Sequence, residues 1–254
     1  MANPLFDSVF STPAWAWTLH ASGVQERLRE TDLHALATVC PPRTYRRGDH
    51  VYRLGDAADD LYVLIDGSVK LSAPARLGGE RVLAVCGPDD FFGESFLAGG
   101  SVRNADAVCL DTGTVVCGIS RDAFLTLARQ SPGVVLAFTA AFAARAHDLQ
   151  ERLGFLSHRA EMRLARVFLD LAVRLGQGRQ PGLEPVDWVT LSLDVRHEDL
   201  AGLAHMSRAT VTEVLSQWRA LGLLVGTRGE YQVNVGGLSE WCDALEHRDA
   251  GGLS

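Results

Sequence analysis

The sequence of 254 residues contains a single lysine, Lys70, and its formal net charge is −7. Contacts between basic side chains and phosphates supply most non-specific affinity for nucleic acid, so any such binding here must depend on arginines gathered locally. Metal-binding spacings are missing as well, because the five cysteines include no Cys-x-x-Cys pair. The sequence therefore predicts free thiols, with no zinc site and no iron–sulfur cluster.

Long apolar runs are also missing. The longest, residues 134–144, ends at Arg145 and is shorter than the roughly 20 apolar residues that a helix needs to cross a bilayer. No basic segment followed by an apolar signal core stands near the start of the sequence. We therefore expect a cytoplasmic protein without membrane contact, in which 47% apolar residues suffice for the cores of two domains.

Two apolar patterns in the C-terminal third predict a helix-turn-helix. Leu200, Leu203 and Ala204 share one helical face, and the pattern resumes after a break at residues 205–207. A serine at the end of this break can cap the second helix, whose outward positions would then meet DNA as a recognition helix does. The candidate DNA-binding residues are Ser207, Arg208, Ala209, Thr210, Thr212 and Glu213 on the second helix and His197 at the start of the first.

The segment after the second helix predicts a β-hairpin wing. A turn at residues 226–230 is followed by alternating apolar residues, Tyr231, Val233 and Val235. Further on, one short helix is predicted at 239–245, before a polar end. A helical hairpin inside a larger domain would explain the two helices alone, but the wing favours a winged helix-turn-helix that binds DNA.

The N-terminal half shows the pattern of an antiparallel sheet. Short runs of β-forming residues between 45 and 71 are broken by glycine-containing turns. Further strands are predicted at 80–86 and 106–119, with a turn at 87–90. The sequence thus predicts a β-roll, or jelly roll, and with the later helices an α+β fold.

Between these two parts the sequence predicts a long dimerisation helix at 131–156. Its apolar positions recur in alternating steps of four and three, as in a coiled coil of about three heptads. The predicted seam is Val135, Thr139, Phe142, Ala146, Leu149, Leu153 and Leu156. A helix packed only against its own β-roll is the alternative. A two-fold dimer would place two recognition helices about 34 Å apart, so the expected DNA target is an imperfect palindrome.

Three strings stand in the chain in this order: "YRRGDHVYRLGDAADDLYVLIDGSVKL", "FFGESFLAGGSVRN" and "HEDLAGLAHMSRATVTEVLSQW". Together they resemble the cyclic-AMP receptor protein and fumarate–nitrate regulator family of bacterial transcription factors. The resemblance implies a homodimer with a cyclic-nucleotide-binding-type β-roll, a dimerisation helix and a winged helix-turn-helix, which contacts RNA polymerase when it activates. The corresponding divisions are an extension at 1–22, the β-roll at 23–130, the dimerisation helix at 131–156, the DNA-binding domain at 157–237 and a tail at 238–254.

The resemblance also implies an effector site in the β-roll. Gly93 and Glu94, with Arg103 nine residues after the glutamate, reproduce the family's cyclic-nucleotide loop, and Ser95 and Asn104 lie beside them. Arg103 would bind the cyclic phosphate and Glu94 the ribose 2′-hydroxyl. Alternatively, these two side chains pair with each other and brace an empty roll.

Several residues depart from the pattern of cyclic-AMP binders. Phe96 replaces a small residue and could crowd the phosphate, Asn104 stands where Ser or Thr is expected, and residues 146–148 lack the hydroxyls that contact adenine. Cyclic AMP is therefore one candidate effector, and another small effector or none are the alternatives. No cofactor is required in any of these cases.

In the recognition helix the resemblance assigns phosphate contacts to Ser207 and Thr210 and a base contact to Arg208. His197 matches another phosphate position. Ala209 and Glu213 replace residues that are often Glu and Arg in the family, so we expect an operator that differs from the usual one.

Taken together, the sequence predicts a homodimeric, sequence-specific transcription regulator that is not an enzyme. A regulator that binds DNA without an effector, its β-roll being structural, is the main alternative. A jelly-roll enzyme is disfavoured, because the sequence shows neither a His cluster with metal-ligand spacing nor a pair of nucleophile and base.

Overall fold

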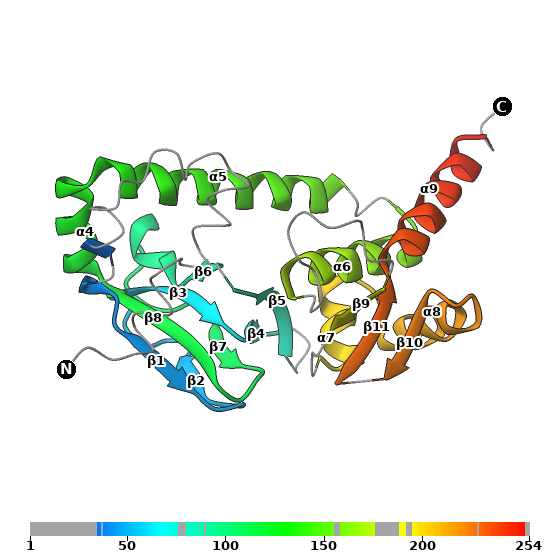
Figure 1. Ribbon diagram of the computed structural model, residues 1–254, viewed down its shortest axis with the longest axis horizontal. Helices are drawn as coiled ribbons and strands as arrows, with labels where there is room; N and C mark the ends of the chain where they lie inside the picture. The colour runs from blue at the N-terminus through cyan, green and yellow to red at the C-terminus, as the bar shows by residue number, and fades with distance from the viewer. Residues whose placement is uncertain are drawn as a thin grey trace. The chain divides into compact units, whose positions relative to one another are not determined.

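The computed structural model describes residues 35–36, 38–75, 80–88, 90–154, 158–175, 188–191, 195–227 and 229–251. The predicted extension at 1–22 lies outside these residues, as does Leu156 of the predicted seam. The chain divides into two units, one of Met1–Ala73 with Cys86–Leu153 and one of Pro74–Val85 with Gly154–Ser254. Figure 1 labels their helices and strands.

The N-terminal strands form two four-stranded sheets, in the orders β1-β8-β3-β6 and β2-β7-β4-β5. The strands are β1 Pro42–Tyr45, β2 His50–Tyr52, β3 Asp60–Asp66, β4 Val69–Pro74, β5 Glu80–Cys86, β6 Phe91–Phe92, β7 Asp106–Cys109 and β8 Thr114–Ser120. Neighbours in these sheets are mostly distant in sequence and pair antiparallel, as β3 does with β8. The predicted β-roll is thereby confirmed.

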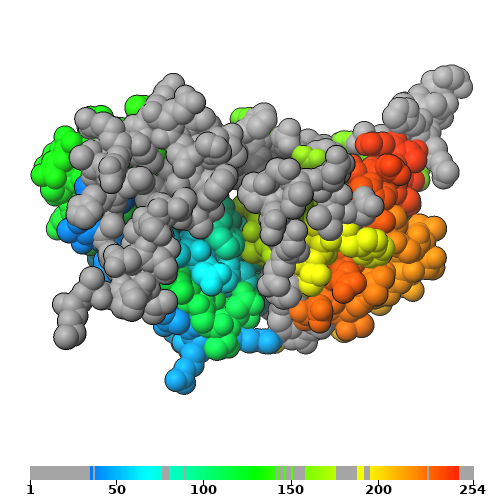
Figure 2. Space-filling view, viewed as in Figure 1, coloured from blue at the N-terminus to red at the C-terminus, as the bar shows by residue number. Residues whose placement is uncertain are grey.

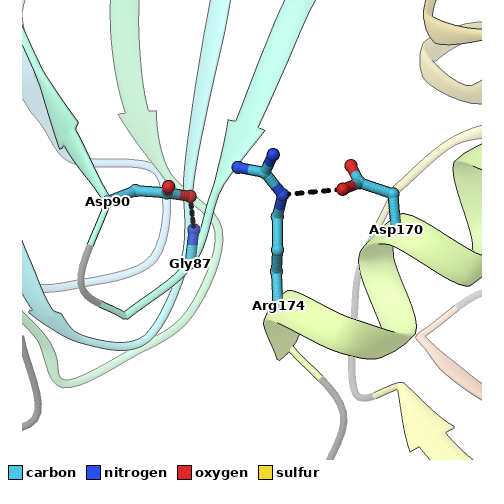
Figure 3. A network of polar contacts seen from close by, with 4 residues as sticks. All are labelled: Gly87, Asp90, Asp170 and Arg174. Atoms are coloured by element: carbon cyan, nitrogen blue, oxygen red, sulfur yellow. Dashed lines mark hydrogen bonds and ion pairs between the residues drawn. The ribbon is translucent and has the colours of Figure 1, made fainter. Parts of the chain in front are cut away.

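The predicted turn at 87–90 joins β5 to β6. The backbone N–H of Gly87 donates to Oδ2 of Asp90 at 2.9 Å (Figure 3). The N–H of Asp90 donates back to the Gly87 carbonyl at 3.1 Å. An aspartate that accepts from a nearby backbone N–H stabilises such a turn locally. This turn leads directly into β6 and the glycine at position 93.

Two helices follow β8, namely α4 at Arg121–Gln130 and α5 at Pro132–Gly154. Their aromatic side chains pack on the β-roll. The ring centroids of Phe91 and Phe142 are 4.4 Å apart, and those of Phe124 and Phe138 are 5.3 Å apart, both edge to face. Such pairs add about 0.5–1.5 kcal/mol each beyond the burial of their area. The first part of α5 is therefore held on its own β-roll.

The exposed side of α5 has a regular spacing of its own. Leu136, Thr139, Ala143, Ala146 and Gln150 are all exposed, in alternating steps of three and four. This face keeps the predicted period and two of the predicted seam residues, the threonine and the second alanine.

The structure places one of the other predicted seam residues differently. Phe142 packs against Phe91 and so belongs to the side of the helix that faces the β-roll, while Val135 is half-buried. The physical reason is that a large apolar side chain packs equally well against its own β-roll or against a partner helix. The spacing of apolar residues along the helix does not distinguish these two surfaces. The side chains of Leu149 and Leu153 lie outside the described residues.

The second unit contains a winged helix-turn-helix, as predicted. Its elements are α6 Ala160–Leu175, β9 Trp188–Leu191, α7 His197–Leu203, α8 Arg208–Ala220, β10 Leu224–Thr227, β11 Glu230–Asn234 and α9 Val235–Gly251. The antiparallel wing sheet has the order β10-β11-β9. Its third strand, β9, was missed by the sequence pattern.

The core of this unit is built around Trp218, which is 0% exposed. Its ring lies edge to face against Phe168 of α6, with centroids 5.6 Å apart, and against Trp241 of α9, at 5.8 Å. Tyr231 of the wing also lies edge to face with Phe168, with centroids 5.5 Å apart. One indole thus joins the recognition helix to α6 and α9.

The C-terminal helix differs from the prediction. Val235 begins α9 instead of continuing the wing strand, and the helix extends to Gly251 instead of covering only 239–245. Side-chain capping and burial explain the earlier start, because Oδ1 of Asn234 accepts from the N–H of Gly237 at 2.8 Å and Leu238 is 0% exposed. Burial outweighs the poor helix propensity of the glycines at 236 and 237.

We predict that Trp218→Ala lowers the free energy of unfolding of the DNA-binding unit by about 3–5 kcal/mol, because it leaves a large cavity between three elements. Trp188→Ala is the matched control, since Trp188 is 38% exposed, and should cost under about 1 kcal/mol. Urea unfolding followed by far-UV circular dichroism measures both. Equal losses in the two variants would contradict the assigned core.

Candidate DNA and effector sites

The recognition helix α8 begins as the sequence predicts. Ser207 has an extended backbone (φ −78°, ψ 151°), and its Oγ accepts from the N–H of Thr210 at 3.1 Å. The two hydroxyl oxygens are 2.8 Å apart. Both hydroxyls therefore lie at the N-terminus of a 13-residue helix, where the macrodipole favours a negative group such as a phosphate.

The outward face of α8 is open. Arg208, Ala209, Thr212 and Glu213 are exposed, whereas the opposite face, which includes Trp218, is buried. In the space-filling view the orange atoms that include α8 reach the surface (Figure 2). The structure thus brings the predicted DNA-binding residues of this helix together on one accessible face or at its first turn.

Arg208 has one ionic partner among the described residues. Its Nη1 lies 3.9 Å from Oε1 of Glu198, and the two side chains are 70% and 63% exposed. A pair this exposed contributes little to stability, so it would not hold the arginine away from another partner. The observed ionic partner is thus Glu198 of α7 and not Glu213, which lies on α8 itself.

His197 links the two helices of the motif. Its Nδ1 lies 2.9 Å from Oγ1 of Thr212, whose hydroxyl also donates to the Arg208 carbonyl at 3.0 Å. Burial lowers the pKa of His197, and the positive charges of Arg219 and Arg208 lower it further. The neutral imidazole is therefore favoured in the free protein.

The predicted effector loop surrounds a buried arginine. Gly93 precedes a short 3-10 helix, Glu94–Ala98, and has a φ of 81°, which suits glycine. A Cβ at this position would lie 2.9 Å from Nη1 of Arg103 and equally close to Cδ2 of Tyr62. Glycine is therefore required here, because it lets the loop approach the guanidinium.

Arg103 itself is 2% exposed. Its Nη1 donates to the carbonyl of Gly93 at 2.5 Å and its Nη2 to the carbonyl of Asp60 at 2.8 Å. The guanidinium carbon lies 4.4 Å from the ring centroid of Tyr52 and 5.4 Å from that of Tyr62, within the range of cation–π attraction. No sequence pattern pointed to either tyrosine, because neither is near the loop in sequence.

No carboxylate pairs with Arg103 among the residues that the structure describes, and its Nε has no hydrogen-bond partner there. The predicted alternative, in which Glu94 and Arg103 pair with each other, is therefore not what the structure shows. A buried cation that has one N–H group without a partner attracts a negative group. The residues present thus fit an anionic ligand.

The surrounding residues differ in burial. Phe96 is 7% exposed, and its ring packs in the core, 6.2 Å from Phe124, with the guanidinium of Arg121 over its face. The ring of Phe96 therefore lies in the core, whereas the sequence suggested that it could crowd the phosphate of the effector. Ser95 is half-buried and Asn104 is exposed.

Burial also raises the pKa of the two tyrosines around Arg103. Desolvation raises the pKa of Tyr62 to about 12, with the charge of Asp60 adding to the effect and Arg103 opposing it. Burial likewise raises the pKa of Tyr52, which Arg103 partly offsets. Both phenols therefore stay neutral near pH 7 and present only their faces and hydroxyls.

Within the described ranges no group of three or more His, Cys, Asp or Glu side chains could hold a metal ion. Nor is any described helix both long and apolar enough to cross a bilayer.

Comparison with known proteins matches both halves of the chain. Residues 42–131 match the family "Cyclic nucleotide-binding domain", and residues 162–239 match "Crp-like helix-turn-helix domain". The chain is 32% identical to the cyclic AMP receptor protein of Thermus thermophilus over 199 residues, which are 78% of this chain and 86% of that protein.

Two further similarities agree with this match. The chain is 27% identical to a CRP-like cAMP-activated global transcriptional regulator of Mycobacterium tuberculosis over 205 residues, 80% of this chain and 88% of that protein. The structure of FixK2 from Bradyrhizobium japonicum has the same fold, with a TM-score of 0.65, 21% identity and coverage of 80% of this chain and 96% of that one.

The lowered pKa of His197 should make the stability of the protein depend on pH. Because the folded pKa lies below the ordinary value of 6.5, the unfolded chain binds the proton more tightly. The resulting stability is complete above the ordinary pKa and is lost as the pH falls through the lower, folded pKa. We expect the wild type to lose stability relative to His197→Gln as the pH falls below the ordinary value of 6.5.

Urea unfolding at several pH values, together with NMR titration of the ring proton, measures this effect. A ring that titrates at or above 6.5 in the free protein would contradict the assigned environment.

Proposed function

This chain belongs to the cyclic-AMP receptor protein and fumarate–nitrate regulator family of DNA-binding transcription regulators, and from this we propose that its homodimer binds an imperfect palindrome under the control of an anionic effector at Arg103. The observation that carries the effector part is the buried guanidinium, which no described carboxylate neutralises. The DNA part rests on the open face of α8 and its capped N-terminus.

On DNA, each group of α8 would have a separate task. Ser207 and Thr210 would bind phosphate at the helix N-terminus and set the position of the helix, while Arg208 would bind O6 and N7 of a guanine as a fork.

Ala209 offers only a methyl contact, and Glu213 would accept from the amino group of cytosine or adenine. His197 would add a phosphate contact, which raises the pKa that the free protein holds low.

For the dimer, we propose the exposed face of α5 as the contact between two copies. Leu136 is 47% exposed, and the face continues in small or polar residues at Thr139, Ala143, Ala146 and Gln150. The helix has 23 residues and is about 34 Å long, enough for three heptads. Small side chains let two helices approach closely. Family regulators act as dimers, and two-fold symmetry would explain a palindromic target.

For the effector, we propose cyclic AMP. A bound cyclic phosphate would supply the negative charge that Arg103 lacks, Gly93 and Ser95 would offer backbone donors, and Glu94 would accept from the ribose hydroxyl. The exposed Asn104 lies beside Arg103 in sequence and would serve at the rim. To act as a switch, the ligand must bind the DNA-competent state more tightly than the other state.

One observation favours a second candidate. Two donors of Arg103 already bind main-chain carbonyls, and Tyr52 covers its face, so the guanidinium has partial compensation within the β-roll alone. A regulator that binds DNA without an effector would need no more than this.

The remaining assignments follow from the family. We propose that the protein works in the cytoplasm, that it contacts RNA polymerase where it activates transcription and that it catalyses no reaction. No cofactor is needed for the DNA contacts described above.

We predict that a random-sequence duplex library yields one enriched palindrome for the wild type when cyclic AMP is present, at one fixed salt concentration. In Arg103→Met the enrichment should no longer depend on cyclic AMP, because the cyclic phosphate no longer meets the guanidinium. Arg129→Met is the control, since Arg129 is exposed on α4. Circular dichroism verifies that each variant folds. If Arg103→Met does not fold, Arg103→Lys, which retains the positive charge, takes its place.

Three outcomes are distinguishable. The same palindrome with and without cyclic AMP in the wild type would establish the effector-independent candidate. Unchanged dependence in Arg103→Met would show that the nucleotide binds elsewhere. No palindrome under either condition would contradict the proposed function as a whole.

We further predict that Arg208→Ala loses about 1–3 kcal/mol of discrimination at one base pair in each half-site, while the dimer stays folded. Glu198→Gln, which removes only the exposed ionic partner of Arg208, should retain the discrimination. Competition binding with operators changed at single positions measures both. Unchanged discrimination in Arg208→Ala would refute the base contact.

A further inference from the structure

The second unit contains an arginine that neither the sequence pattern nor the DNA contacts involve. Arg163 lies on α6, and its guanidinium donates three hydrogen bonds to main-chain carbonyls. Nε donates to Ala204 at 2.9 Å, Nη2 to His205 at 2.9 Å and Nη1 to His158 at 2.7 Å.

Two of these acceptors form the turn between α7 and α8. Ala204 is the C-cap of α7, where carbonyls lack partners within the helix. His205 has a φ of 51° and is the only non-glycine residue with positive φ among those described. This conformation is disfavoured for an L residue and persists where its surroundings fix it. The guanidinium binds the carbonyl of the strained residue and that of its neighbour.

The direction of α8 depends on this turn. Met206 donates its N–H to the Ala201 carbonyl at 3.0 Å, and Ser207 caps α8 immediately afterwards. A change of the backbone angles at His205 would therefore rotate the whole recognition helix relative to α7.

The third acceptor ties the turn to the start of the unit. His158 lies just before α6, and its carbonyl receives the remaining donor of Arg163. A guanidinium can bridge three acceptors in this way because its N–H groups are fixed in one plane, whereas an ammonium is a point charge on a flexible stem. The three carbonyls thus come from the turn inside the motif and from the segment just before α6.

From these contacts we propose that Arg163 is a positioning residue for DNA recognition. It fixes the turn between α7 and α8 and thereby the orientation in which Arg208 meets the bases. This inference rests on the proposed function, because it assumes that α8 discriminates between DNA sequences.

The test uses full-length Arg163→Met, which keeps an unbranched apolar stem and removes the guanidinium with its donors. At fixed salt and with cyclic AMP present throughout, we expect the ratio of affinities for the selected palindrome and for a scrambled duplex to fall about tenfold, as when one bidentate base contact is lost. Affinity for the scrambled duplex should stay within about twofold, because phosphate contacts remain. Arg163→Lys should lose less, and Arg129→Met should match the wild type.

Amide hydrogen exchange gives an independent readout. In Arg163→Met we expect faster exchange at residues 204–207, with exchange in the wing strands β10 and β11 unchanged. A merely structural arginine would instead raise exchange over the whole unit and weaken both duplexes equally, and that result would overturn the proposal. So would an unchanged affinity ratio or unchanged exchange at the turn.

If the wild type selects no palindrome, the proposed function fails. Exchange at residues 204–207 then decides the role of Arg163 in the turn by itself: local acceleration supports it, and its absence overturns it.

Discussion

Burying a guanidinium without a carboxylate is costly, and the β-roll is arranged around that constraint. Arg103 is 2% exposed, and its compensation comes from two carbonyl oxygens and the faces of two tyrosines. Gly93 has to be glycine because its own carbonyl and Cα approach this cation. Carbonyl dipoles and tyrosine π faces compensate the positive charge less completely than an anion would. The site is therefore stable enough to fold and still gains from a negative ligand, which is the property that an effector site needs.

The same device recurs in the DNA-binding unit. Arg163 also binds main-chain carbonyls, and there it fixes a strained turn instead of awaiting a ligand. Both tasks depend on the planar, multiply donating guanidinium, which lysine does not replace. In a chain with one lysine, we thus propose three roles for arginine: anion site, structural bridge and, at Arg208, exposed base contact. Their differing burial separates these roles, because only the exposed arginine is free to meet a base.

The sequence predicted what depends on local spacing. The helix-turn-helix, the Ser207 cap, the wing and the turn before β6 follow from periodicity and from residues three or four positions apart. Contacts between distant residues were not predictable. Phe142 was assigned to the dimer seam because nothing in the spacing reveals that Phe91 lies beside it. Tyr52 and Arg163 were missed for similar reasons: a ring that stacks on a distant arginine leaves no pattern, and carbonyl acceptors have no residue identity.

Isothermal titration of cyclic AMP into the full-length protein measures whether Arg103 receives an anionic effector. We expect saturable binding at one site per subunit in the wild type, no measurable binding in Arg103→Met, and wild-type binding in Arg208→Ala, whose substitution lies in the other unit. Absence of binding to wild-type protein that still binds DNA would contradict the claim for cyclic AMP. Equal binding by Arg103→Met would contradict the assignment of the site.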